Sequence, residues 1–199
     1  MKNIEIEALK DRRSIYALGK NVTVPKEEIS DIVKEAIRQS PTAFNSQSVR
    51  AVITFGDSSD RVWDIVEESL KKVVPADNFE ATKEKIASFR AGFGTILYFT
   101  ETDTVHKLEQ DFPLYAENFA FWAEQGLGGA QQAVWQALAV AGIGANLQHY
   151  NPLIDDAIKE AFDIPASWQL RAQMPFGSIE APAGQKEFLP DDVRFKVFD

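Results

Sequence analysis

The sequence predicts a single domain of mixed helices and strands, and three observations support this class. The chain of 199 residues is 45% hydrophobic and 26% charged, a composition typical of globular domains. A chain of this size buries roughly 70% of the surface of its unfolded state, which is enough for one core. Helical and extended patterns follow one another without strict alternation and without an internal repeat. We therefore expect one domain over residues 1–199.

The first half of the chain contains two clear strands and several helices. Residues 23–41 have the spacing of an amphipathic helix, whose apolar face consists of Ile29, Ile32, Val33, Ala36 and Ile37. Residues 49–56 and 94–100 are short, rich in β-branched or aromatic side chains and bounded by turn residues, which predicts strands. Between these strands we expect one amphipathic helix over residues 57–74 and a second over residues 78–89.

The middle of the chain, residues 114–142, carries apolar and small side chains around most of a helical circumference. A helix that is apolar all round is buried all round. Two interpretations remain open: a central core helix within a monomer, or a helix whose burial is completed by a second subunit. We favour the dimer, because one small domain has little surface with which to cover such a helix. Gly126, Gly128 and Gly129 could break this helix.

The last third of the chain predicts a short strand or loop, a helix, a strand and a tail. The loop or strand covers residues 145–150. The helix covers residues 151–165, with Asn151 at its N-cap and Pro152 in its first turn. Residues 167–180 predict the last strand. The tail over residues 181–199 has apolar residues without a long periodic pattern, so we expect it to lie along a surface, either of its own chain or of a partner.

Charge and composition exclude several classes of function. A formal net charge of −9 argues against a nucleic acid or an anionic membrane as partner, because both attract basic surfaces. The sequence has no cysteine, and therefore no disulfide or thiolate site. Its start lacks the apolar core of a signal peptide, and no run approaches the ~20 apolar residues of a membrane span. We expect a cytoplasmic protein.

The common catalytic motifs are absent from the sequence. There is no G-x-S-x-G elbow, no H-E-x-x-H pair and no Walker-type phosphate loop. The stretches "GLGGAQ" and "GIGANL" lack the third glycine of a dinucleotide fingerprint. His106 and His149 are far apart in the sequence, so a metal site built on histidine is not expected.

Two polar stretches remain as candidates for a binding site. In "DRRSIYALG", Arg12 and Arg13 stand beside Ser14 and Tyr16, and two guanidinium groups next to a hydroxyl can bind a phosphate. Such an arginine pair near a helix end can equally be a solvated complement of the helix dipole. In "QSPTAFNSQSV", residues 39–49, many uncharged hydrogen-bonding groups gather between a helix and a strand.

Several stretches together resemble the nitroreductase family of flavoproteins. "RRSIYALG", "SPTAFNSQ" and "AGIGANLQHYNP" occur in the order and spacing of that family, and the match covers nearly the whole chain. The end of the chain, "PFGSIEAPAGQKEFLPDDVRFKVF", is similar to the subfamily of oxidative-stress nitroreductases, also described as fatty-acid-repression proteins. The resemblance implies an α+β sandwich, with a mixed sheet flanked by helices, in an intertwined homodimer with two FMN sites at its interface.

The resemblance also implies a set of FMN-binding residues. One chain would hold the phosphate end and the ring, and the loop around Asn45 would reach the flavin of the partner subunit. The backbone near Gln148 and His149 would lie at the reactive edge of the flavin, although many family members have glutamate where this chain has His149. The implied cofactor-binding residues are Arg12, Arg13, Ser14, Tyr16, Pro41, Thr42, Asn45, Gln47, Leu147, Gln148, His149 and Lys186.

The function implied by the resemblance is reduction of nitroaromatic or quinone-like compounds. FMN would take a hydride from NADH or NADPH, and the acceptor would then occupy the same pocket in ping-pong exchange. The flavin would carry the chemistry, so no side chain is expected to be an obligatory acid or base, and no metal is expected. An alternative is an FMN-binding regulatory or stress-sensing protein with incidental reductase activity. Four aromatic side chains are candidates either for stacking on a planar substrate or for the core: Phe44, Phe119, Phe121 and Trp122.

Overall fold

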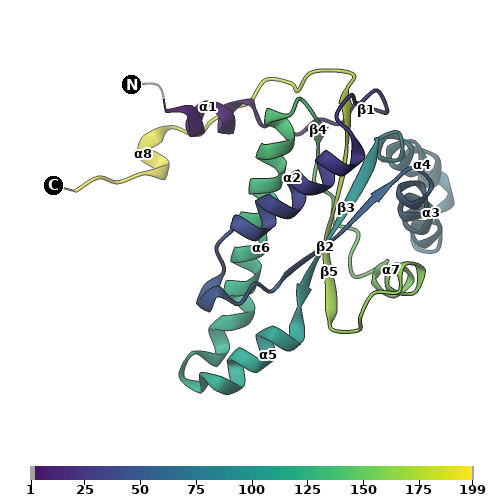
Figure 1. Ribbon diagram of the computed structural model, residues 1–199. Helices are drawn as coiled ribbons and strands as arrows, with labels where there is room; N and C mark the ends of the chain where they lie inside the picture. Colours follow the sequence, from purple (N-terminus) through teal and green to yellow (C-terminus); the bar gives the residue numbers. More distant parts are fainter. Residues whose placement is uncertain (1–2, 199) are drawn as a thin grey trace.

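The computed structural model describes residues 3–198 and shows helices packed on both faces of a central sheet (Figure 1). The α-helices are α1 (Ile4–Asp11), α2 (Lys26–Gln39), α3 (Asp57–Lys71), α4 (Ala76–Arg90), α5 (Thr102–Asp111), α6 (Ala116–Val140), α7 (Asp155–Phe162) and α8 (Asp191–Arg194). The strands are β1 (Leu18–Gly19), β2 (Val49–Phe55), β3 (Gly94–Glu101), β4 (Gly144–Ala145) and β5 (Trp168–Ile179). Helices α2 and α6 cover one face of the sheet, and α3, α4 and α7 cover the other. This is the α+β sandwich that the resemblance to the family implied.

The sheet has the strand order β1-β5-β3-β2, and β4 also pairs with β5. We expected a mixed sheet, but every ladder between the named strands is antiparallel. The one parallel pairing within residues 3–198 is an isolated bridge between Ser14 and Ala145. This bridge is too short to form a ladder, and it brings the N-terminal segment beside β4.

Strand β3 is buried along its whole length and separates two cores. Successive side chains of a strand point to opposite faces. Ile96 and Tyr98 therefore join the core beneath α2 and α6. Leu97 and Phe99 join the core beneath α3, α4 and α7. Burial of the Tyr98 hydroxyl, which contacts the sulfur of Met174 at 3.7 Å, raises its pKa.

Helix α6 is continuous over 25 residues, so its glycines do not break it. At Gly126 an added Cβ would lie 3.2 Å from Cγ2 of Thr42, and the glycine allows the loop before β2 to approach the helix closely. At Gly128 and Gly129 an added Cβ would meet nothing within 4 Å. These two positions face open space in the single chain.

Two helices differ from the sequence-based expectation. Helix α7 begins at Asp155, so the predicted start with Asn151 at the N-cap is wrong. Residues 151–154 form a turn instead, and Ile154 at the end of this turn is fully buried in the core that contains Trp63. Helix α5 was not expected, since it buries only Val105 and shows little apolar pattern. Its start is capped by the side chain of Glu101, which accepts hydrogen bonds from the N–H groups of Asp103 and Thr104.

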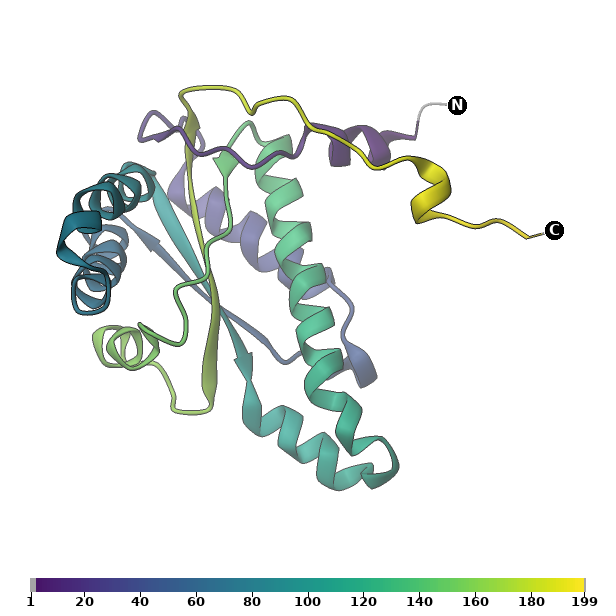
Figure 2. The same cartoon turned by 180° about the vertical axis from the view of Figure 1, so that it is seen from behind.

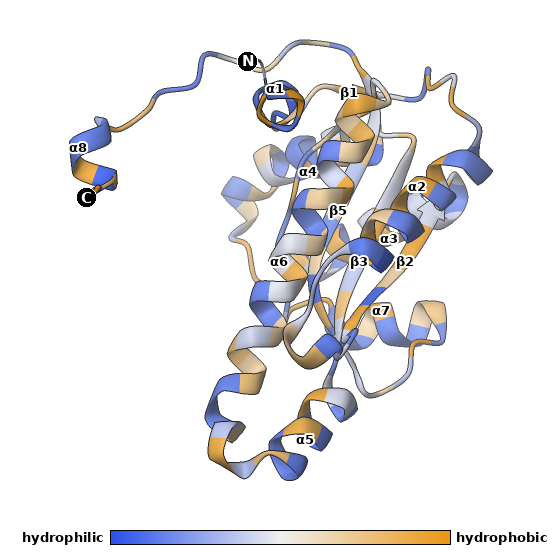
Figure 3. Ribbon diagram, turned by 60° about the vertical axis from the view of Figure 1, so that its left-hand side comes forward, coloured by the Kyte–Doolittle hydropathy of each residue, from blue (hydrophilic) through white to orange (hydrophobic). Residues whose placement is uncertain are grey.

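The tail after β5 crosses the end of the molecule beside α1 and then leaves the body, as the view from behind shows (Figure 2). Its apolar side chains are exposed in the single chain: Phe188, Leu189, Val193, Phe195, Val197 and Phe198. Figure 3 shows hydrophobic residues among hydrophilic ones in α8. Within residues 3–198, no helix is both long enough and apolar enough to cross a membrane.

A buried hydrogen-bond network on Thr95 joins α3 to the sheet. The indole N–H of Trp63 donates to Oγ1 of Thr95 at 2.9 Å, and Oγ of Ser59 lies 2.8 Å from the same atom. Oγ1 of Thr54 donates to the Thr95 carbonyl at 2.8 Å. All these groups are buried, so water cannot replace a hydrogen-bond partner that is lost.

We therefore expect Thr95→Val to lower the free energy of unfolding by about 2–4 kcal/mol, because Trp63 and Ser59 each lose a buried partner. Thr95→Ser keeps the hydroxyl and is the matched control, with a loss of about 1 kcal/mol for the missing methyl group. Urea unfolding at one fixed protein concentration measures both. Equal stability of the valine variant and the wild type would show that the network contributes nothing.

Candidate functional site

A groove of about 520 Å³ lies between the segment after α1 and the start of the tail. Arg12, Arg13, Ser14 and Tyr16 line one side, and residues 181–186 line the other. The groove therefore brings Lys186 together with the two arginines, although they are far apart in the sequence. Three cationic side chains in one groove form a local basic site in a protein of net charge −9.

The two arginines of this groove have different environments. The guanidinium carbon of Arg12 lies 4.5 Å from the centroid of the Trp135 ring on α6. Burial, and secondly the neighbouring charge of Arg13, lower the pKa of Arg12. Within residues 3–198, the Arg12 side chain makes no hydrogen bond or ion pair, so its donors are available to a ligand. Arg13 instead donates from Nη2 to the carbonyl of Gly184 at 2.6 Å and fixes the far wall of the groove.

Asn146, which the sequence reasoning did not single out, connects two of the predicted segments. Its side chain is fully buried, and its Nδ2 donates to the carbonyl of Ile15 at 2.8 Å. Its Oδ1 accepts from Nε2 of Gln148 at 2.8 Å. The N–H of Ile15 also donates to the carbonyl of Ala145 at 2.9 Å. These bonds hold residues 14–16 beside residues 145–148. In the sequence, the signal for this contact is an asparagine inside the glycine-containing, otherwise apolar stretch "GIGANL".

Part of the backbone of residues 147–149 is hydrogen-bonded to strand β5. Gln148 and Gln173 exchange two backbone hydrogen bonds, in which the N–H of Gln148 donates at 2.7 Å. We expected the backbone near Gln148 to serve the reactive edge of a flavin, but this N–H already has a partner. Within the described part of the chain, the N–H groups of Leu147 and His149 have no backbone partner. The His149 side chain is exposed.

The loop over residues 41–47 has an unusual backbone. Phe44, Asn45 and Gln47 have φ values of 56°, 49° and 49°, in the left-handed region that non-glycine residues rarely adopt. Oγ1 of Thr42 accepts from the N–H of Gln47 at 2.9 Å and closes the loop. Pro41, Asn45 and Gln47 are exposed, and among residues 3–198 no hydrogen bond forms to the side-chain amides of Asn45 and Gln47. The loop therefore offers neutral donors and acceptors to solvent or to a ligand.

An aromatic cluster holds this loop against α6. The ring of Phe44 lies 4.9 Å from that of Phe112, 5.2 Å from that of Phe119 and 6.3 Å from that of Trp122, measured between centroids. Phe119 is buried, so of the four aromatic candidates it belongs to the core. Phe44 and Phe121 are exposed, and Trp122 is half-buried. Phe44 and Trp122 also line an apolar groove of about 520 Å³ beside the loop.

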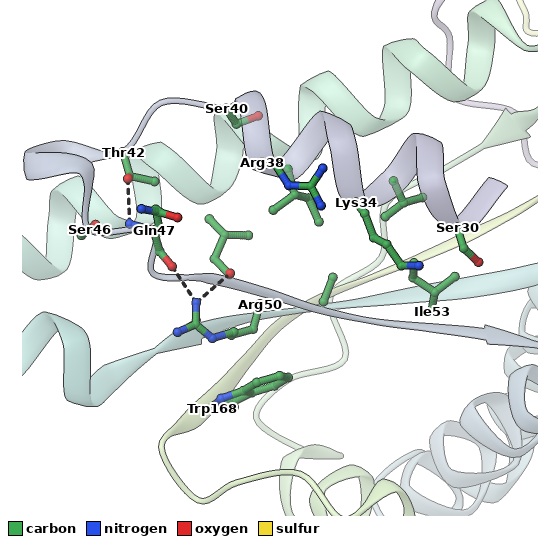
Figure 4. A pocket seen from close by; sticks show the side chains of 14 residues that line it. Ser30, Lys34, Arg38, Ser40, Thr42, Ser46, Gln47, Arg50, Ile53 and Trp168 are labelled. Carbon is green, nitrogen blue, oxygen red and sulfur yellow. Dashed lines mark hydrogen bonds between the residues drawn. The ribbon is translucent and has the colours of Figure 1, made fainter. Parts of the chain in front are cut away.

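A larger groove of about 850 Å³ lies between α2 and the outer edge of β2, and it reaches the same loop (Figure 4). Nη1 of Arg50 donates to the carbonyls of Gln47 at 2.6 Å and Val49 at 3.1 Å. Arg50 therefore anchors the end of the loop to β2. Thr42 and Gln47 line the groove at this end, whereas the residues around Arg12 do not.

The structure divides the predicted site residues of one chain into two groups. Arg12, with its neighbours and Lys186, lies near Trp135 of α6, and residues 41–47 lie near Gly126. These two contact points are separated by about two and a half turns, roughly 14 Å along the helix axis. The groove around Arg12 and the grooves around the loop share no lining residue.

The chemistry that these groups can perform is binding rather than catalysis. Cationic donors suit a phosphate, and neutral amides suit a polar uncharged ring. Within residues 3–198, no group of three or more His, Asp or Glu side chains is arranged to hold a metal ion.

Comparison with known proteins gives both sequence and structural relatives. Structures of the nitroreductase CinD from Lactococcus lactis, in complex with chloramphenicol, nicotinic acid or 4-nitrophenol, are 49%, 51% and 49% identical, with TM-scores of 0.91, 0.91 and 0.90. In each, the match covers 98% of this chain and 100% of that chain. The nitroreductase FRM2 of Saccharomyces cerevisiae is 34% identical over 186 residues, which are 92% of both proteins.

A likeness of fold alone links the chain to a nitroreductase from Desulfitobacterium hafniense DCB-2 with bound FMN. The two are 14% identical, with a TM-score of 0.72, and the match covers all of both chains. The model of the nitroreductase family matches residues 9–178, which include most of the predicted site. On this match, and on the identity to FRM2 over nearly its whole length, the chain belongs to the nitroreductase family.

Proposed function

We propose that this protein is an FMN-dependent oxidoreductase that takes a hydride from NADH or NADPH and reduces nitroaromatic or quinone-like compounds. FMN is the cofactor of the family to which the chain belongs. The observation that carries the proposal is the groove that Arg12 and Lys186 line together, in which the Arg12 donors are unpaired within residues 3–198. The nitroaromatic ligands and the nicotinic acid bound by CinD support the proposed acceptors and the nicotinamide donor.

The residues of this chain fit the phosphate end of FMN. Arg12 and Lys186 would bind the phosphate oxygens by charge-assisted hydrogen bonds, and the Ser14 hydroxyl lines the same groove. Arg13 is a weaker candidate than the sequence suggested, because Gly184 already occupies one of its donors. A compact groove with no second cationic subsite among its lining residues suits FMN, which has a single phosphate.

The ring of FMN would be held by neutral groups. The N–H groups of Leu147 and His149 are donors without a backbone partner, and Asn45 and Gln47 offer side-chain amides. When bound, FMN supplies the ring that accepts and releases electrons; we propose that the nicotinamide and the acceptor use one pocket in turn. The chain's own groups would position the ring, and the aromatic cluster around Phe44 would border the acceptor.

We also propose that the working unit is a homodimer in which the loop reaches the flavin of the partner subunit. Two features support this. An apolar groove of about 650 Å³ runs along α6 past Gly129, Ala133 and Ala137. The tail also carries several large apolar side chains that are exposed to solvent in the described part of the single chain. The separation of the two groups of site residues agrees with sites completed by a second chain. A cytoplasmic location stays a prediction.

The first prediction concerns turnover. We expect the FMN-loaded protein, mixed with NADH or NADPH without oxygen, to lose its flavin absorbance at about 1 s⁻¹ or faster, as is usual for enzymes. Stopped-flow absorbance measures the rate, and addition of 4-nitrophenol or a quinone should restore the absorbance. Bleaching that takes many minutes with both nicotinamides would favour a regulatory or sensory protein with incidental activity.

The second prediction concerns the dimer. Gly129→Glu is sterically tolerated in the single chain, where an added Cβ meets no atom within 4 Å, but it would place a charge in the proposed interface. We expect this variant to sediment as a folded monomer and to lose bound FMN. Ala81→Glu, at an exposed position of α4 on the other side of the sheet, is the control and should remain dimeric. A dimeric Gly129→Glu variant would place the interface elsewhere.

The third prediction tests which chain supplies each group of residues. Arg12→Glu and Asn45→Asp should each inactivate a homodimer. If the site is shared, a mixed dimer has one intact site and one site with both changes. Unfolding, mixing and refolding should then recover up to about a quarter of wild-type activity, because about half of randomly assorted dimers are mixed. If both groups act within one chain, mixed dimers form but activity does not return.

A further inference from the structure

The contact between Arg12 and Trp135 is a prominent link between the N-terminal helix and the rest of the protein. Helix α1 buries none of its own residues. Besides the Arg12 guanidinium over Trp135, a hydrogen bond of 3.3 Å from Nε2 of Gln136 to Oε2 of Glu5 connects α1 to α6. Two neighbouring residues of α6, Trp135 and Gln136, therefore hold the position of α1 and of the Arg12 side chain that follows it.

The Trp135 ring is held in place by its contacts with the core. It packs against the core that contains Leu138 and Ile143, and its Nε1 atom is buried without a hydrogen-bond partner within the described residues. A tryptophan in a polar role would normally use this donor. The ring therefore contributes here through its face and its apolar surface.

Stacking on a ring orients an arginine without occupying its donors. The N–H groups of a guanidinium lie in its plane and point outward from its edge, whereas a cation–π contact uses the face. Trp135 can thus hold Arg12 in place while the edge stays free for two parallel hydrogen bonds to a phosphate. Arg13 shows the contrasting case, because its position is fixed by a hydrogen bond to Gly184 that uses a donor.

Contact with Trp135 also removes water from Arg12. The arginine is half-buried, and burial is the main cause of its lowered pKa, although the group stays charged. A cation that is already partly desolvated and held in one orientation loses less hydration and less side-chain freedom when a phosphate binds.

We propose that Trp135 is a positioning residue for the phosphate end of the flavin, acting through Arg12 to select FMN over the phosphate-free riboflavin. This inference rests on the proposed function, since it assumes that the groove binds the FMN phosphate. It assigns to α6 a role in cofactor selection, beyond its place in the core.

The test uses flavin-free protein titrated with FMN and, separately, with riboflavin, followed by flavin fluorescence. Trp135→Leu removes the π face but keeps an apolar side chain, and should weaken FMN binding by about 3- to 10-fold. Riboflavin binding should stay within about 2-fold. Trp135→Phe keeps an aromatic face and should retain most of the FMN affinity. Phe162→Leu, which disturbs the contact between Arg61 and Phe162 on α3 and α7, is the control and should change neither affinity.

A double-mutant cycle then shows whether Trp135 acts through Arg12. In an Arg12→Ala background, Trp135→Leu should cause no further loss of FMN affinity. Additive losses, or equal losses of FMN and riboflavin affinity, would overturn the proposal and leave Trp135 a structural residue. If Trp135→Leu does not fold, Trp135→Met takes its place in the same cycle, because it also removes the π face, and a loss that adds to that of Arg12→Ala again rejects the role. Wild-type protein that binds neither flavin would contradict the proposed function itself.

Discussion

The burial of β3 on both faces is the constraint on which the rest of the structure depends. All eight of its residues are buried, and their alternation supplies apolar groups to two separate cores. A strand with two apolar faces requires helices on both sides. One of these layers contains α6, whose 25 residues run past both groups of candidate site residues. The spacing between the groove at Arg12 and the loop at Thr42 is thus set by a helix that packs on β3.

Local charge, rather than net charge, governs the candidate cofactor site. The chain carries a formal charge of −9, yet Arg12, Arg13 and Lys186 meet in one groove. Exposed charges farther away than about 8–10 Å are largely screened at physiological salt. Groups that touch the ligand therefore dominate its binding. Arg12 lies over the Trp135 ring at 4.5 Å and Lys186 over the Phe188 ring at 5.1 Å, and within residues 3–198 neither side chain makes a hydrogen bond. Arg13 is instead held by its hydrogen bond to Gly184.

The loop over residues 41–47 combines strain with aromatic packing. Left-handed backbone conformations at Phe44, Asn45 and Gln47 cost about 1–3 kcal/mol each, and aromatic contacts contribute about 0.5–1.5 kcal/mol per pair. Phe44 takes part in both, since its ring joins the cluster on α6 while its backbone carries the strain. A loop held in this way is already ordered before a ligand arrives, which lowers the entropy lost on binding.

Local sequence patterns determined the strands β2, β3 and β5 and the helices α2, α3, α4 and α6. Burial of one face makes apolar residues recur at regular spacings along the chain, and this spacing can be read from the sequence. The resemblance to a family supplied FMN and the residues that meet in the groove. Tertiary structure alone decided that Ile154 is buried in a turn before α7, and that a polar α5 packs beside the first turns of α6. It also decided which residues Asn146 and Trp135 contact. Their partners, Ile15 and Arg12, lie more than a hundred residues away, and such contacts leave no local period in the sequence.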